Sequence, residues 1–146
     1  MATVFDVAAY IIEKAGPQHP VSLQKLVYYS YSWHLVWEGE RLFDQPIEAW
    51  RNGPVVKALY DHHKNTVKVS SEIVRGDVNN LTPSEKESID AVLEAYGSKK
   101  PWELSSLSHL ESPWINARER AGAKDGDSSN ERLLDEDIMD FYSQLA

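Results

Sequence analysis

The sequence contains no cysteine, and this absence excludes several kinds of protein. Without thiols the chain can form no disulfide framework, no cysteine nucleophile and no thiolate metal site. No apolar run reaches the roughly 18 residues that are needed to span a bilayer. The first residues, MATVFDVAAYIIEKAG, lack the basic stretch and the cleavage site of a signal peptide. These absences favour a cytoplasmic protein that is not embedded in a membrane.

The motifs that mark common enzyme families are also missing. The chain has no Gly-rich phosphate loop, no Gly-x-Ser-x-Gly elbow and no His-Glu-x-x-His motif. Gly53 is a lone glycine before Pro54, which is typical of a turn and not of a nucleotide-binding loop. His62 and His63 point to different faces of a helix, so they cannot bind one ion together. We therefore expect no catalytic, cofactor-binding or metal-binding residues.

Two further histidines remain as candidates for chemistry. His34 lies in an aromatic-rich helix, where a core histidine bonded to a backbone carbonyl is commoner than a ligand. His109 lies at a helix boundary, which favours a capping or turn role. A small enzyme would need both imidazoles and a carboxylate to converge in an open cleft. A His-based enzyme therefore stands as an alternative to a protein that acts by binding.

The charge of the chain is distributed unevenly. The net charge is −8, yet residues 1–70 carry seven basic and seven acidic residues. Residues 125–146 carry seven acidic residues against Arg132 alone. Such a chain repels phosphate backbones, so a regulator that binds nucleic acid is a disfavoured alternative. The acidic residues either solvate a surface or attract a basic partner.

Periodicity and capping signals predict a mainly α fold. We expect a single compact multi-helix domain over residues 1–146, with about six to seven helices and a small β element of short strands. Capping boxes begin helices at Thr3 and Thr82, and Gly16, Gly39 and Gly97 follow helix ends. Residues 47–50 alternate as a short strand does, and residues 65–80 indicate one or two more. The predicted helices cover residues 3–14, 22–38, 53–64, 83–96, 101–109, 112–121 and 135–145.

The stretch from Leu23 to Tyr60 is the most informative part of the chain, because it holds eight of the fifteen aromatic residues. Trp33 and Trp37 lie one helical turn apart and share a face. Burial favours the core for Trp33, whereas core and partner contact are equally favoured for Trp37. For Trp50 a position in the core is slightly favoured over a partner contact. Further along the chain, Trp114 is expected to attach its short helix to the body of the protein.

Several ordered blocks of residues resemble the Panacea domain, the family that includes the SocA-like antitoxins and was earlier labelled phage-associated protein. The resemblance runs from the first helix to about Arg120. The matching residues include Leu23, Gln24, Lys25, Leu26, Tyr28, Tyr29, Trp33, His34, Trp50, Gly53, Pro54, Val55, His109, Pro113 and Trp114.

The resemblance implies a mainly helical antitoxin of a toxin–antitoxin pair, without cofactors. Such proteins neutralise a cognate protein toxin by direct contact, and the toxin is usually encoded by a neighbouring gene. SocA-like members instead deliver the toxin to a cytosolic AAA+ protease. We favour direct masking over delivery, and we expect no direct contact with nucleic acid or membrane.

The motif residues are expected to specify the fold, so the contacts with the toxin should lie elsewhere. As partner-binding residues we predict Tyr31, Trp37 and Arg51. Asp137 and Asp140 are predicted to attract a basic surface of the partner.

Overall fold

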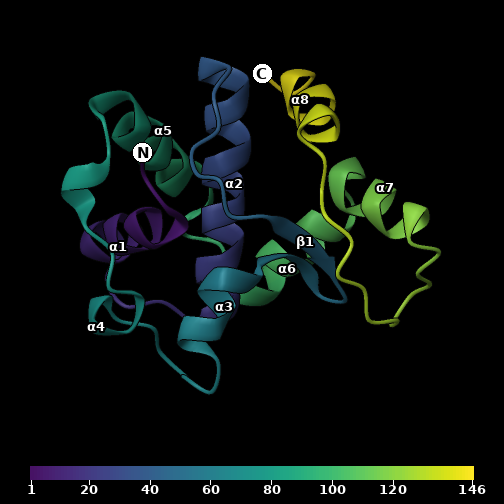
Figure 1. Cartoon of the computed structure of the whole chain (residues 1–146), viewed down its shortest axis with the longest axis horizontal. Coiled ribbons are helices and arrows are strands. Elements are labelled where there is room, and N and C mark those ends of the chain that lie inside the picture. Colours follow the sequence, from purple (N-terminus) through teal and green to yellow (C-terminus); the bar gives the residue numbers. More distant parts are fainter.

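The longest helix, α2 (Pro20–Glu38), passes through the middle of the molecule, and the other elements surround it (Figure 1). The computed structural model describes all residues from 1 to 146. The helix is buried without interruption from Ser22 to Leu35. This burial follows from the sequence, because apolar side chains occur on every side of the helix.

The start of α2 differs slightly from the prediction. The helix begins at Pro20 and not at Ser22, because proline is favourable as the first helical residue. His19 caps this end, and its Nδ1 accepts a hydrogen bond from the Val21 N–H over 3.1 Å. The predicted end is confirmed, since Gly39 adopts the left-handed conformation that stops a helix.

Two capped helices pack against one side of α2: α1 (Val4–Ala15) and α5 (Pro83–Tyr96). Each begins with the capping box that the sequence predicts. The capping carboxylate of α1, Asp6, is buried and also accepts a hydrogen bond from the Asp77 N–H over 2.8 Å. The caps therefore define helix starts and also attach neighbouring loops.

A two-stranded antiparallel hairpin lies on the other side of α2. It consists of β1 (Ile47–Trp50), which was predicted, and β2 (Gly53–Val56). The segment before the last helix joins β1, since the Leu133 N–H donates to the Ile47 carbonyl over 2.8 Å. The hairpin thus connects the central helix to the C-terminal part of the chain.

The prediction that Gly53 begins a helix is wrong. Residues 53–56 form β2, and the helix α3 (Lys57–His63) starts only afterwards. Val55 and Val56 at the end of β2 favour a strand, and Val56 pairs with Ile47 of β1. The presence of a partner strand therefore outweighed the helix-start signal of Gly53-Pro54.

The prediction of strands in residues 65–80 is also wrong. The segment forms a short helix, α4 (Ser71–Val74), and a 3-10 helix, η1 (Val78–Asn80). Its only β pairing is an isolated bridge between Val69 and Gln18. The apolar residues of this segment are too few to distinguish a strand from a helical turn. With α4 the chain has eight α-helices, one more than the upper prediction.

The remaining helices agree with the predictions within two residues at each end. They are α6 (Pro101–His109), α7 (Ser112–Arg120) and α8 (Asp135–Ser143). Helices α6 and α8 pack on α2, and α7 packs between α8 and the hairpin. None of the helices combines the length and the hydropathy that a membrane crossing requires.

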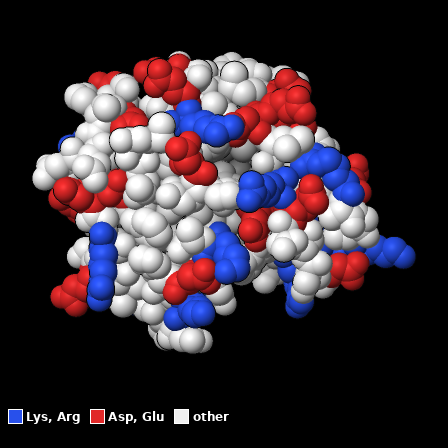
Figure 2. Space-filling view, viewed as in Figure 1, with Lys and Arg blue, Asp and Glu red and all other residues white.

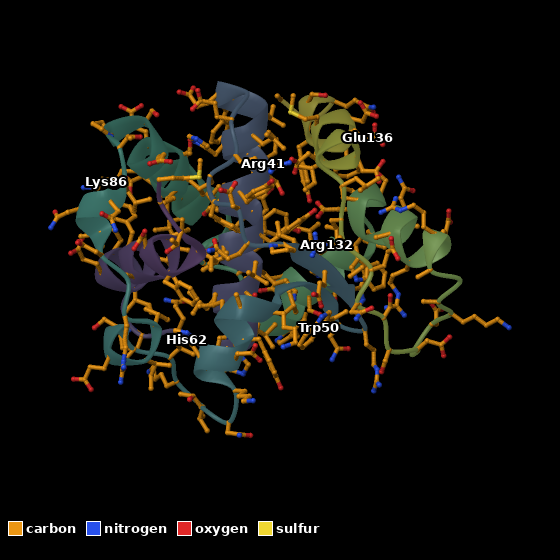
Figure 3. The ribbon with its side chains drawn as sticks, in the orientation of Figure 1. Arg41, Trp50, His62, Lys86, Arg132 and Glu136 are labelled. Atoms are coloured by element: carbon orange, nitrogen blue, oxygen red, sulfur yellow. The ribbon has the colours of Figure 1, made fainter.

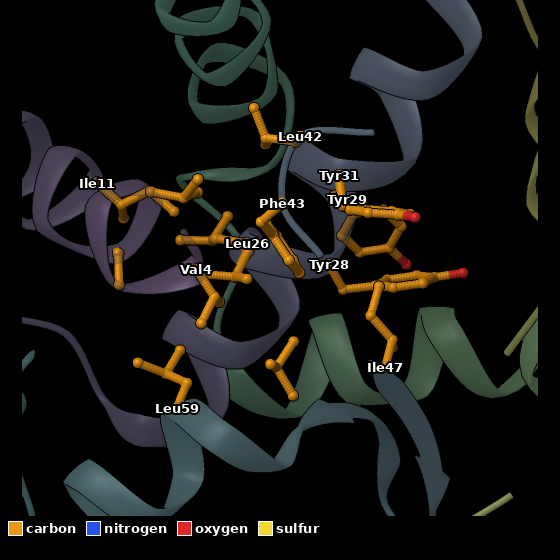
Figure 4. Close-up of a cluster of buried hydrophobic side chains, with 14 of the residues drawn as sticks. Val4, Ile11, Leu26, Tyr28, Tyr29, Tyr31, Leu42, Phe43, Ile47 and Leu59 are labelled. Carbon is orange, nitrogen blue, oxygen red and sulfur yellow. The ribbon is translucent and has the colours of Figure 1, made fainter. Parts of the chain in front are cut away.

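One continuous core joins α1, α2, the hairpin and the C-terminal helices. Figure 4 shows its centre, where Leu26 lies near Val4 and Phe43, and Tyr28 lies next to Ile47. All these side chains are almost completely buried. The mainly α fold with a small β element is therefore confirmed.

A buried carboxylate links three helices at the edge of this core. Glu111, at the start of α7, accepts hydrogen bonds from the hydroxyls of Tyr29 on α2 (2.7 Å) and Tyr142 on α8 (2.8 Å). The Tyr142 hydroxyl is also hydrogen-bonded to that of Tyr28, over 2.9 Å. Burial raises the pKa of Glu111, while the bonds from Tyr29 and Tyr142 act in the opposite direction. The hydroxyls replace water that the carboxyl group loses on burial.

Replacement of Tyr142 by Phe tests this cluster. Y142F leaves Glu111 with one donor, so the free energy of unfolding should fall by about 1–3 kcal/mol in urea denaturation. Y60F is the matched control, because Tyr60 is half-buried and its hydroxyl takes part in none of the side-chain hydrogen bonds. The control should change the value by no more than about 0.5 kcal/mol. Equal effects of the two changes would contradict a stabilising role for the cluster.

Candidate functional site

Two adjacent polar residues in the buried part of α2 bind the backbone of β2. The first is Gln24, whose Oε1 accepts a hydrogen bond from the Val56 N–H (2.9 Å) while its Nε2 donates to the Val56 carbonyl (3.2 Å). Because donor and acceptor of one residue are both engaged, the orientation of the Gln24 amide is fixed. Gln24 therefore attaches the hairpin to the central helix as a neighbouring strand would.

The second residue, Lys25, binds the same strand. Its Nζ donates a hydrogen bond to the Pro54 carbonyl over 3.0 Å. The side chain passes directly beside Gly53, which has φ of +121°. A Cβ atom at Gly53 would lie 2.6 Å from Lys25 Cε and 2.8 Å from Ser108 Oγ. Only glycine fits here, for both its conformation and its lack of a side chain.

Lys25 is a buried basic residue without an acidic partner. Only 2% of it is exposed, and it takes part in none of the ion pairs of the structure. Burial lowers the pKa of Lys25 from 10.5 to about 7. An ammonium group has three N–H donors, of which Pro54 engages one. The group therefore retains hydrogen-bonding capacity.

His63 on α3 has a similar free donor. Its Nε2 lies 2.9 Å from the Gln24 Nε2, and the fixed Gln24 amide must donate there. The proton of the neutral imidazole therefore resides on Nδ1. Burial lowers the pKa of His63, which favours this neutral form. The Nδ1 atom is buried and has no hydrogen-bond partner.

Lys25 and His63 line the same pocket, which we call the Lys25 pocket; its volume is about 700 Å³. This volume lies within the range of small-molecule sites, about 300–1,000 Å³. Its walls come from the first turns of α2, the hairpin, α3 and residues 128–130. Trp50 and Tyr60 form an edge-to-face pair in the wall, with ring centroids 4.8 Å apart. Figure 3 shows Trp50 at the lower end of the hairpin.

Basic groups outnumber acidic groups around the Lys25 pocket. Besides Lys25, the lining includes Arg51 and Lys57, of which Lys57 is paired with Asp61 over 2.9 Å, and Glu48 is the one acid. The Glu48 carboxylate accepts a hydrogen bond from the Trp50 Nε1 over 2.8 Å. The pocket is therefore locally basic in a chain whose net charge is −8.

Sequence reasoning did not identify this pocket. Tyr60, His63 and residues 128–130 come from separate segments, and no sequence motif joins them. One signal was available: Gln24 and Lys25 are adjacent polar residues in a helix that is otherwise apolar on all sides. Such a pair must find partners on folding, and those partners are the backbone of β2 and His63, which lines the pocket.

Three of the residues predicted to contact a partner differ in their exposure. Trp37 is 46% exposed and stacks on Trp33, with centroids 5.3 Å apart. Arg51 is exposed at the rim of the Lys25 pocket and donates a hydrogen bond to Ser128 over 3.1 Å. Tyr31 is buried, and its hydroxyl donates to Asp135 over 2.6 Å. This placement is typical of a structural role, so the structure does not present Tyr31 to a partner.

The two acidic residues predicted to attract a partner also differ. Asp137 forms an ion pair with Arg120 over 3.0 Å and is only 17% exposed. Asp140 is exposed and forms no ion pair. Acidic side chains gather over α8 at the upper right of Figure 2, and Figure 3 shows Glu136 among them. Asp140 is therefore the freer of the two predicted contacts.

Most of the motif residues lie in the interior. Trp50 and His109 are half-buried, and the others are buried: Leu23, Gln24, Lys25, Leu26, Tyr28, Tyr29, Trp33, His34, Gly53, Pro54, Val55, Pro113 and Trp114.

Trp114 attaches α7 to the hairpin, in agreement with its predicted role. Its Nε1 donates a hydrogen bond to the Trp50 carbonyl over 2.8 Å. The ring stacks on His109, with centroids 4.4 Å apart, and the Arg118 guanidinium lies over it at 4.9 Å. Arg118 in turn donates to the Ala49 carbonyl over 3.0 Å.

The two histidines of the enzyme alternative have separate surroundings. His34 is buried between α2 and α5, and its Nδ1 lies 2.8 Å from the Ser88 hydroxyl. The prediction of a core histidine is thus confirmed, although its partner is a hydroxyl and not a carbonyl. His109 stacks on Trp114, and neither imidazole lines the Lys25 pocket. No group of three or more His, Asp or Glu side chains is arranged to hold a metal ion.

Replacement of Lys25 by Met tests the burial of its charge. Between the lowered pKa of about 7 and the ordinary value of 10.5, the unfolded chain binds more protons than the folded one. The wild-type protein should therefore become more stable as pH rises through this window, relative to K25M. The difference in free energy of unfolding should change by about 1.4 kcal/mol per pH unit above about pH 7.

Urea denaturation of both proteins at a series of pH values measures this change. K64M is the control, because Lys64 is exposed, and its difference from wild type should stay constant with pH. A constant difference for K25M as well would show that folding does not lower the pKa of Lys25.

The comparisons with known proteins agree with the motif blocks. The model of the family described as antitoxin SocA-like, Panacea domain, matches residues 23–115, which is more than half of the chain. This range includes most of α2, the hairpin and the start of α7. No curated protein and no solved structure matches the chain. The chain belongs to the SocA-like antitoxin family and carries its Panacea domain.

Proposed function

We propose that this protein neutralises a cognate protein toxin in the cytoplasm by binding to it directly. The observation that carries the proposal is the family match over residues 23–115, which supports an antitoxin role in general and suggests a non-enzymatic one. A protein that acts by contact needs an exposed surface that can exclude water from its partner. The structure offers a suitable surface at the end of α2 and along α8.

Trp37 is the aromatic residue of this surface. It stacks on Trp33, whose ring lies 5.5 Å from that of Tyr142 on α8. Trp37 is therefore exposed on a support, Trp33, that is already packed against α8. A preorganised tryptophan loses little conformational freedom on binding, so it can contribute strongly to affinity.

The outer face of α8 supplies the charge. Its exposed residues Glu136, Met139, Asp140 and Ser143 recur at helical spacing, so they share one face. Glu136 and Asp140 place negative charge around the exposed Met139. An acidic face of this kind favours a basic surface on the toxin.

Co-expression with the toxin encoded by a neighbouring gene tests the proposal. The wild-type protein should restore growth and co-purify with the toxin. Replacement of Trp37 by Ala should weaken the complex by about 2 kcal/mol, or about 30-fold in Kd. W102A is the matched control, because Trp102 on α6 is 66% exposed but lies outside this surface. The control should bind as the wild type does.

Three outcomes separate the alternatives. Growth that stays arrested, together with separate elution of the two proteins, would contradict an antitoxin role for this pair. An equal loss of affinity for W37A and W102A, or no loss for either, would show that the interface does not include Trp37 and the surface at α8. Toxin levels with and without the host AAA+ protease distinguish the two modes, since masking leaves the toxin intact and delivery removes it.

A further inference from the structure

Two residues that line the Lys25 pocket have hydrogen-bond donors without an acceptor in the protein. Lys25 uses one N–H for the Pro54 carbonyl, and its remaining capacity has no acceptor. The His63 Nδ1 carries a proton and has no partner. Both residues are at least nine-tenths buried, so leaving these donors unsatisfied costs free energy. An acceptor bound in the pocket beside Lys25 would remove that cost for the lysine.

The charge of the lining indicates that this acceptor carries negative charge. Lys25 has no carboxylate partner, and Arg51 adds a second positive charge at the rim. The first turns of α2 also line the pocket, and the N-terminal end of a helix favours an anion. Glu48 limits this preference, because it would repel a ligand that carries several negative charges. One buried ammonium group matches a single carboxylate better than a phosphate dianion.

The walls define the rest of the ligand. Trp50 and Tyr60 provide aromatic surface, and Val21 and Val55 add aliphatic contacts. A flat apolar group can pack on such surfaces while its polar end is directed to the donors. The polar and the apolar parts of the lining are therefore both accounted for by one type of molecule.

We propose that the Lys25 pocket binds a small organic carboxylate, whose charge is bound by Lys25 and whose flat apolar body packs against Trp50 and Tyr60. This site goes beyond the proposed antitoxin function and does not depend on it. It is formed by α2, the hairpin, α3 and residues 128–130, whereas the proposed toxin surface lies on α8 and the far end of α2.

Two probes of equal shape test the proposal: 2-naphthoate, which carries the charge, and 2-naphthamide, which does not. NMR titration of the full chain should show perturbation of the Trp50 indole signal by naphthoate. The Kd for naphthoate should be at least about tenfold lower than that for the amide. K25M should abolish this preference, and K64M, at an exposed lysine outside the pocket, should retain it.

A pH series on the wild-type protein provides a test that needs no variant. The charged or titratable groups near Lys25 are Glu48 and Arg51 on the hairpin, Lys57 and His63 on α3, and His109 on α6. Burial lowers the pKa of both His63 and His109, so neither gains charge above pH 7.

Only the Lys25 ammonium is therefore lost as pH rises just above 7. The preference for naphthoate should decrease by about tenfold per pH unit above the pKa of the free lysine. Binding of the amide should not change over the same range.

The proposal is overturned if naphthoate fails to bind at millimolar concentration, or if it binds no better than the amide at pH 7. A preference that persists in folded K25M would also overturn it, as would a preference that does not change with pH. Perturbation of signals far from Trp50, with the Trp50 indole unchanged, would place the carboxylate at a different site.

Discussion

The attachment of the hairpin to the central helix is the constraint on which the rest of this structure depends. An almost completely buried helix needs neighbours on every side, and one neighbour is a strand whose backbone groups also require partners. Gln24 and Lys25 meet both needs, because they bind the backbone of β2 from inside the helix. Gly53 follows from this arrangement, since a side chain there would occupy the space of the lysine.

The same attachment links the fold to the Lys25 pocket. Gln24 fixes the proton of His63, and Lys25 brings a cationic group to the pocket without an acidic partner. Residues that hold the hairpin in place therefore also determine the hydrogen-bonding character of the cavity. The exposed face of α8 lies apart from this region, so a surface for a toxin can be built without changing the interior.

The sequence predicts those parts of the fold that local chemistry determines. Helices α1 and α5 were predicted correctly, because their capping boxes act within three residues. Gly53-Pro54 was misread, because its strand depends on pairing with β1 across the turn and on hydrogen bonds to Gln24, 32 residues away from Val56. A helix-start signal reports neither of these contacts. Residues 71–74 lacked a clear period. The Lys25 pocket was missed for a related reason, since Tyr60 and His63 meet Lys25 only through the packing of α3 on the hairpin.

Lys25 is a buried lysine bonded to the hairpin backbone, and the attachment of β2 depends on this burial. NMR titration of the Lys25 side chain, with isotopically labelled lysine, tests this claim most directly. A pKa of about 7 is expected, because burial without a carboxylate partner disfavours the ammonium form. Titration near the ordinary value of 10.5 would show a solvated lysine. That result would contradict both the attachment of β2 by Lys25 and the character assigned to the pocket.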